Sequence, residues 1–226
     1  MIPVGDTEVR GSGPGILTIA LIVINVIVFL FEAMMSTPEL ENFFRTYGVV
    51  PAQIMQGSGL ITLFTHMFLH GGWMHLISNM VFLWVFGDNI EAVLGKVMYL
   101  AFYIAGGLAA AALQILIDPA STIPSVGASG AIAAILGAYI VMFPRSQVKV
   151  MVMSRVGMGM TRVTALVFLG IWFVTQLFSG VASLGVPTAQ TGGIAFWAHI
   201  GGFLFGLVVG FLFRGRAGRL PLTESA

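Results

Sequence analysis

The sequence contains no cysteine and few charged residues. The absence of cysteine from all 226 residues excludes disulfide scaffolds, thiolate metal sites and cysteine nucleophiles. Charged residues make up 8% of the chain, against about a quarter in soluble domains, and 58% of it is hydrophobic. With a net charge of +1, the chain lacks the excess of positive charge that attracts nucleic acid. This composition excludes soluble and disordered proteins and predicts a polytopic membrane protein.

Several apolar stretches are long enough, or nearly so, to cross a bilayer, which takes about 20 helical residues. The six stretches run over residues 16–34, 73–90, 97–117, 129–143, 163–184 and 194–213. The fourth is short. The predicted fold is therefore an all-α bundle of six transmembrane helices over residues 15–214, with an N-terminal tail at 1–14 and a short polar tail at 215–226.

The basic residues predict the orientation, because cytoplasmic segments are enriched in lysine and arginine. Four fall between the fourth and fifth stretches, at positions 145–162, and three follow the sixth, at 214–219. Six spans place both segments on one side, so both termini are predicted to be cytoplasmic. The connection 35–72 then lies outside and is predicted to be a structured interfacial segment. The short termini, without a transit peptide, indicate a prokaryotic plasma membrane.

Ionisable side chains within membrane spans are costly, and they usually mark functional sites. In the last stretch, His199 is followed by Gly202, Gly206 and Gly210, at offsets of 3, 7 and 11. All four residues therefore lie on one helical face. Glycines in such a stripe let another helix backbone approach closely. The stripe predicts tight helix packing directly below His199.

A second small-residue stripe begins at Ser129 and continues through Ala133 and Gly137. Packing the two stripes together would bring Ser129 and His199 within side-chain reach at the same outer depth. A serine beside a histidine is an activated nucleophile, because the imidazole accepts the hydroxyl proton. The aspartates lie away from this depth, so the sequence predicts a Ser129–His199 dyad.

Acyl transfer also needs hydrogen-bond donors for the developing oxyanion. Ser129 opens a helix, where backbone N–H groups are unpaired, and its own N–H is the first predicted donor. The backbone N–H of Ala128 is a second possibility. His75 and Asn79 lie four residues apart on one helical face and add an imidazole and an amide.

Three separated motifs carry a resemblance to the rhomboid family of intramembrane serine proteases, from about residue 62 to 210. They are His66-x3-His70-x4-His75-x3-Asn79, Gly127-Ala128-Ser129-Gly130 and Ala198-His199-Ile200-Gly201-Gly202.

The resemblance implies a water-filled cavity open to the outside, with Ser129 as nucleophile and His199 as general base. It implies an oxyanion hole made by His75, Asn79 and the Ser129 N–H. The implied substrates are single-pass membrane proteins, cut near the outer end of their transmembrane helix within the lipid bilayer. No metal or organic cofactor is implied.

The sequence departs from the family pattern in two places. Where many members have a Trp-Arg pair, this chain has Ile61 and Thr62. Where some members stack a tyrosine on the catalytic histidine, it has Ala133. Trp197 or a residue of the second helix is then expected to hold His199.

Other polar residues have structural interpretations. His66 and His70 are expected to form hydrogen bonds with the outer segment. Gln114 is expected either to help admit water or to have a packing role between helices.

Other functions remain open from the sequence. No His-Glu-x-x-His run and no pair of intramembrane aspartates is present, which excludes two other intramembrane protease types. The alternatives are a catalytically inactive rhomboid-like binding protein, a small-solute transporter, and a metal-binding protein that uses the four histidines.

Overall fold

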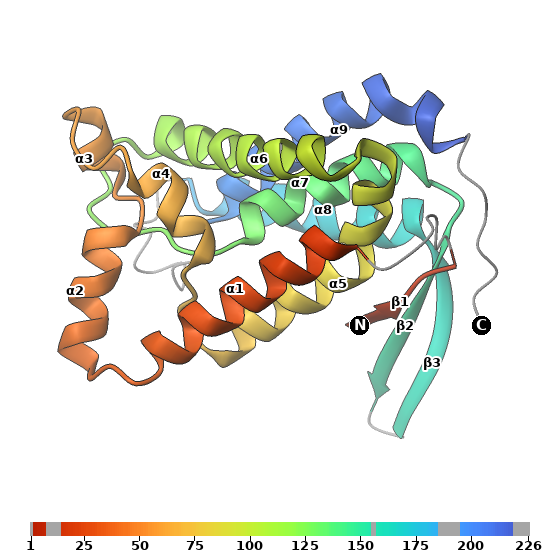
Figure 1. Cartoon of the computed structure of the whole chain (residues 1–226), viewed down its shortest axis with the longest axis horizontal. Coiled ribbons are helices and arrows are strands. Elements are labelled where there is room, and N and C mark those ends of the chain that lie inside the picture. The colour runs from red at the N-terminus through yellow and green to blue at the C-terminus, as the bar shows by residue number, and fades with distance from the viewer. Residues whose placement is uncertain (1, 8–14, 155–156, 185–194, 219–226) are drawn as a thin grey trace.

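The computed structural model describes residues 2–7, 15–154, 157–184 and 195–218, which form a helical bundle with a small sheet at one end (Figure 1). In chain order the elements are β1 (Ile2–Gly5), α1 (Ile16–Glu32), α2 (Thr37–Tyr47), α3 (Pro51–Met55), α4 (Thr62–Thr65), η1 (His66–Phe68), α5 (Trp73–Leu94), α6 (Lys96–Ile117), α7 (Ser129–Met142), β2 (Gln147–Ser154), β3 (Gly157–Thr164), α8 (Ala165–Ala182) and α9 (Phe196–Ala217).

Four of the described helices, α5, α6, α8 and α9, are long and apolar enough to cross a membrane. The helices α1 and α7 are apolar but shorter, at 17 and 14 residues. All six coincide with the predicted stretches to within a few residues. Whether α1 and α7 also span the membrane depends on their position in the bundle, so the count of six spans stays a prediction.

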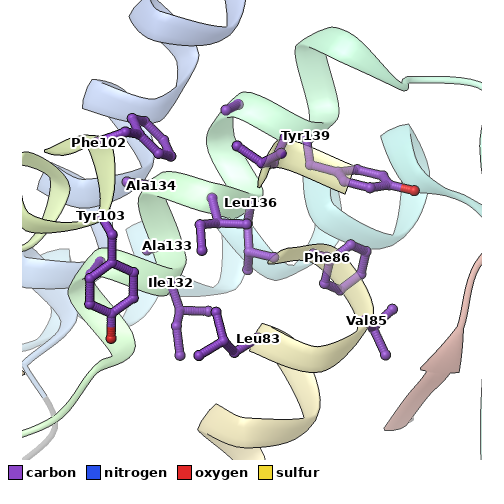
Figure 2. Packing of buried hydrophobic residues seen from close by; sticks show 14 of the residues in the cluster. Leu83, Val85, Phe86, Phe102, Tyr103, Ile132, Ala133, Ala134, Leu136 and Tyr139 are labelled. Atoms are coloured by element: carbon purple, nitrogen blue, oxygen red, sulfur yellow. The ribbon is translucent and has the colours of Figure 1, made fainter. Parts of the chain in front are cut away.

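The helix α7 lies at the centre of the packing (Figure 2). Its side chains are buried on every face, and Figure 2 shows Phe102 and Tyr103 on one side and Leu83 and Phe86 on another. A helix that is apolar all round must be enclosed by protein or lipid, and here protein encloses it. At 1.5 Å per residue, its 14 residues extend over about 21 Å, less than the roughly 30 Å bilayer core.

Glycines bring α9 very close to α7. A Cβ at Gly202 would lie 3.0 Å from the carbonyl carbon of Gly130, and a Cβ at Gly206 would lie 2.9 Å from the Cα of Ala134. Only glycine fits at such a backbone approach. The two small-residue stripes therefore pack together, as their spacing predicted.

A three-stranded antiparallel sheet of order β1-β2-β3 forms at the end of the bundle away from α2 and α3 (Figure 1). The prediction of an all-α fold is wrong here. In β2, Val148 and Val150 are fully buried and alternate with less buried residues, which is the period-two pattern of a half-buried strand. The sequence prediction missed this strand because the basic residues of the segment were interpreted only as an indication of membrane orientation.

Residues 2–7 of the N-terminal segment also belong to the folded structure, although 1–14 was predicted to be a cytoplasmic tail. The strand β1 pairs with β2, and the carboxylate of Asp6 accepts hydrogen bonds from the Asn89 amide at 3.0 Å and from the Tyr139 hydroxyl. These bonds fix the start of the chain to α5 and α7.

The C-terminal boundary differs from the prediction as well, because α9 continues to Ala217. Arginines favour the last turn of a helix, and the guanidinium of Arg216 lies 4.9 Å from the ring centre of Phe213.

The opposite end of the bundle holds the segment 35–72, which contains α2, α3, α4 and η1. Ser36 and Glu39 form a capping box that starts α2. Val49 pairs with Ser125 through two backbone hydrogen bonds of 3.0 and 2.8 Å. The segment is thus structured, and it is tied to the loop that precedes Ser129.

Candidate active site

Ser129 and His199 meet at the start of two closely packed helices. Ser129 is the first residue of α7, and His199 lies in the first turn of α9. The Nε2 atom of His199 is 2.8 Å from the Ser129 hydroxyl oxygen, which is hydrogen-bond distance. The close approach at Gly202, one turn below His199, sets this separation. The pair has the geometry of a serine and its general base.

The other side of His199 contacts α8. The Nδ1 atom is 2.8 Å from the side-chain oxygen of Gln176. The Trp172 ring lies one turn earlier on α8, with its centre 5.9 Å from the His199 ring and a tilt of 36°.

The residues that hold His199 differ from those expected from the sequence. Either Trp197 or a residue of the second helix was expected, but the contacts come from Trp172 and Gln176. The missed signal was their spacing of four residues, which puts an aromatic ring and an amide on one face of an apolar stretch.

His75 lies beside the serine loop, in the first turn of α5. The backbone N–H of Gly71 donates to its Nδ1 at 3.3 Å, so the proton of the neutral ring is on Nε2. Gly127 has a φ of +132°, and a Cβ there would lie 2.8 Å from this Nε2 and 3.5 Å from the Ser129 hydroxyl oxygen. Glycine at 127 therefore leaves open the space that His75 Nε2 and Ser129 both border.

Asn79 lies one turn further along α5 and is buried, with 6% of its surface exposed. Its side-chain N–H₂ group has no hydrogen-bond partner within the part of the chain that the structure describes. A buried donor without an acceptor is unfavourable unless a water or ligand completes it. Ala128 is fully buried at the N-cap of α7, directly before the serine.

His66 and His70 lie in the outer segment and are buried. The Nδ1 atom of His66 hydrogen-bonds the Thr62 carbonyl at 2.9 Å, and the His66 carbonyl accepts the N–H of Gly127 at 2.9 Å. Burial lowers the pKa of His66 to about 4 and that of His70 to about 3, so both are neutral at pH 7. The contacts of His66 are those of a structural anchor.

No group of three or more histidine, aspartate or glutamate side chains that could hold a metal ion gathers in the described ranges. The ring nitrogens of His70 lack hydrogen-bond partners there, and its ring lies 5.1 Å from that of His75. His199 is engaged with Ser129 and Gln176 instead.

A small cavity of about 20 Å³ adjoins Ser129. It is bordered by the outer segment, α6 and the loop before α7, and its lining includes His66, Gln114 and Ser125. The side-chain oxygen of Gln114 is buried, and no described residue donates a hydrogen bond to it. A cavity of this size with polar walls has room for about one water molecule.

Comparison with known proteins matches this chain to one family. A sequence model of the Rhomboid domain matches residues 57–216. The chain is 28% identical to Rhomboid protein 1, mitochondrial, of Saccharomyces cerevisiae over 202 residues, which cover 88% of this chain and 53% of the yeast protein. It is 28% identical to the Presenilin-associated rhomboid-like protein, mitochondrial, of Bos taurus, over 83% of this chain and 46% of that protein.

A bacterial relative is similar over a shorter range. The chain is 30% identical to Rhomboid protease GluP of Bacillus subtilis over 168 residues, which cover 68% of this chain and 31% of GluP. The chain thus spans about half the length, or less, of these three curated relatives.

The expectation of a prokaryotic plasma membrane is contradicted by these comparisons, because the yeast and cattle relatives are named as mitochondrial. The expectation depended on short termini, and the relatives are about twice as long as the region they share with this chain.

Proposed function

This chain belongs to the rhomboid family, and from that premise we propose that it is an intramembrane serine endopeptidase. Ser129 is the proposed nucleophile and His199 the proposed general base. The observation that carries the proposal is the 2.8 Å contact between the Ser129 hydroxyl and His199 Nε2, formed where α7 begins. The name of the similar GluP protein, a rhomboid protease, agrees with this activity.

The length of α7 supports a site below the membrane surface. This helix is about 9 Å shorter than the bilayer core is thick, and its last residues pack near the sheet. The basic residues of 145–162 and the arginines that end α9 lie at that same end, which we propose to be the inner face of the membrane. Ser129 then lies recessed from the outer surface, within reach of the end of a substrate helix.

The first step of the proposed reaction forms a tetrahedral intermediate. The Ser129 oxygen attacks the scissile carbonyl carbon while His199 Nε2 accepts the hydroxyl proton. The negative charge on the carbonyl oxygen is stabilised by the N–H groups of His75, Asn79 and Ser129. The Nε2 proton of His75, assigned by its bond from Gly71, and the unpaired amide of Asn79 support these roles.

The second half of the reaction releases both products. The imidazolium of His199 protonates the departing amine as the C–N bond breaks, and this leaves the acyl-enzyme, an ester of Ser129. A water molecule then attacks the ester, His199 accepts its proton, and the serine hydroxyl is restored. The cavity beside Ser129, with the buried oxygen of Gln114 in its wall, offers a place for that water.

The proposed substrates are single-pass membrane proteins, cut near the outer end of the transmembrane helix. A helix engages its carbonyl groups in its own hydrogen bonds, so the substrate must unwind locally before Ser129 can attack. Because two relatives are named as mitochondrial, a mitochondrial membrane is the location that we propose.

The proposal is tested by cleavage of a model single-pass substrate in liposomes, with chelator present. The wild-type protein should cleave it, and Ser129→Ala and His199→Ala should each lower the rate by more than about 10⁴-fold. Ser78→Ala is the control, since this serine is exposed on α5 and does not line the cavity beside Ser129. It should retain activity.

A fluorophosphonate probe gives an independent measurement, because it labels an activated serine without any substrate. Labelling of the wild-type protein at Ser129, located by mass spectrometry, is the expected result. Cleavage by Ser129→Ala at the wild-type rate would reject the proposal. So would a wild-type protein that neither cleaves the substrate nor reacts with the probe, and the binding or transport alternatives would then take its place.

A further inference from the structure

We infer that Gln176 is a positioning residue that fixes the tautomer and orientation of His199, and this inference rests on the proposed function. Gln176 lies on α8, in the membrane bundle, and does not border the Ser129 hydroxyl itself. Its side-chain oxygen is 2.8 Å from His199 Nδ1, while His199 Nε2 is 2.8 Å from Ser129. The three side chains form one continuous chain of hydrogen bonds, Gln176–His199–Ser129.

The direction of these hydrogen bonds decides whether His199 can act as a base. A neutral imidazole carries one proton, and the nitrogen without it is the acceptor. The Ser129 hydroxyl is activated only if Nε2 accepts, and this requires the proton on Nδ1. A proton on Nδ1 needs an acceptor, which the side-chain oxygen of Gln176 provides.

The amide of Gln176 must also be held with its oxygen towards the ring. Turned over, its N–H₂ group would donate to Nδ1, move the imidazole proton to Nε2 and leave His199 unable to accept from Ser129. The amide nitrogen lies 3.4 Å from the hydroxyl oxygen of Thr175, at the limit of a hydrogen bond. This contact favours the orientation in which the oxygen faces His199.

An amide suits this position because it is uncharged. A carboxylate on a membrane helix is costly, and α8 has no acidic residue. A glutamine oxygen accepts the Nδ1–H bond in both the neutral and the protonated ring, so it holds His199 through the whole reaction. Together with the Trp172 ring one turn earlier on α8, it holds the imidazole in place.

The kinetic test compares Gln176→Leu with Gln176→Glu in the liposome assay. Leucine fills the space without an acceptor, and kcat should fall by about 10- to 100-fold with little change in KM. This is less than the roughly 10⁴-fold loss that a misoriented histidine causes in a charged Ser-His-Asp triad. Phe178→Leu changes an exposed residue of the same helix and should leave kcat unchanged.

The glutamate variant gives a readout that a packing role would not change. A carboxylate can only accept, so Gln176→Glu should retain activity at neutral pH. Its negative charge next to the ring favours the imidazolium, so the acidic limb of the pH–rate profile should move to higher pH. Equal loss of kcat in both variants, with no such displacement, would overturn the inference.

The tautomer is measured directly by ¹⁵N NMR of histidine-labelled protein. The chain has four histidines, and the His199 signals are assigned by their loss in His199→Gln. The wild-type spectrum should show a protonated Nδ1 and an unprotonated Nε2, and Gln176→Leu should show a mixture of both forms. An unchanged His199 tautomer in Gln176→Leu would reject the positioning role.

The two measurements separate the inference from the proposed function. An active wild-type protein whose kcat is unaffected by Gln176→Leu refutes the positioning role and leaves the protease intact. A wild-type protein that neither cleaves nor reacts with the probe refutes the protease. The NMR spectra then still decide whether Gln176 fixes the His199 tautomer.

Discussion

Gly206 of α9 lies against the backbone of Ala134 in α7, and this contact determines how closely the helix that carries His199 approaches the helix that carries Ser129. A Cβ at Gly206 would be 2.9 Å from the Cα of Ala134, closer than non-bonded carbon atoms approach. The separation of the two proposed catalytic side chains is thus set by two such contacts, at Gly202 one turn and at Gly206 two turns below His199.

Gly206→Ala should therefore force α9 and α7 apart. Overpacking at such a contact costs about 1–3 kcal/mol, and the distance from His199 to Ser129 should increase with it. We expect a lower melting temperature and reduced cleavage, measured by thermal unfolding in detergent and by the liposome assay. Gly170→Ala is the control, because no atom outside its own stretch of the α8 backbone lies within 4 Å of its Cβ position. Equal stability of both variants would contradict the prediction.

Asn79→Ala should lower kcat without lowering stability. The loss of one oxyanion donor typically costs 10²–10³-fold, and the remaining donors from His75 and Ser129 should limit the loss to about 10²-fold. The side-chain N–H₂ group has no acceptor among the described residues, so its removal breaks no hydrogen bond donated there. Ser78→Ala, an exposed neighbour on α5, should change neither quantity. A fall in melting temperature that accounts for the lost activity would indicate a structural role.

The stability of the outer segment should depend on His66 at acidic pH. Burial lowers the pKa of His66 from 6.5 to about 4, so the unfolded chain takes up a proton at higher pH than the folded protein does. The contribution of neutral His66 to the free energy of unfolding is therefore fully present above pH 6.5, and it is lost as the pH falls towards 4. Melting temperatures recorded from pH 7.5 to 4 should fall accordingly.

The matched variant for this titration is His66→Asn, whose amide can still donate to the Thr62 carbonyl but does not titrate. Its melting temperature should fall less steeply over the same range. Some slope should remain, because burial also lowers the pKa of His70. Parallel curves for the wild type and His66→Asn would exclude His66 as the source of the pH dependence.

Asp6→Ala should destabilise the end of the bundle that lies away from Ser129. It removes the carboxylate that accepts from the Asn89 amide and the Tyr139 hydroxyl, and hydrogen bonds to a charged group contribute about 1.5–3 kcal/mol. Both donors keep a second acceptor, so the cost should not exceed this range. Hydrogen exchange should increase in β1 and β2, while probe labelling at Ser129 should persist below the melting temperature. Unchanged exchange in both strands would show that Asp6 does not hold the sheet.

The helices were predictable because the bilayer imposes a simple rule. A stretch of about 20 apolar residues must satisfy its backbone internally, so α5, α6, α8 and α9 follow from hydropathy alone. The sheet was not predictable in this way. Its register depends on the packing of Val148 and Val150 against the bundle and on the pairing of β1 with a segment about 150 residues later.

The sequence by itself determined which helix faces meet. The spacing of glycines below His199 and of small residues below Ser129 is a local property, fixed by 3.6 residues per turn, and it predicted the close approach of α7 and α9. It therefore also predicted that Ser129 and His199 lie together. Only the tertiary structure decided what holds His199 in place. The position of α8 around the bundle depends on packing between helices distant in sequence, and this packing brings Gln176 to His199 Nδ1.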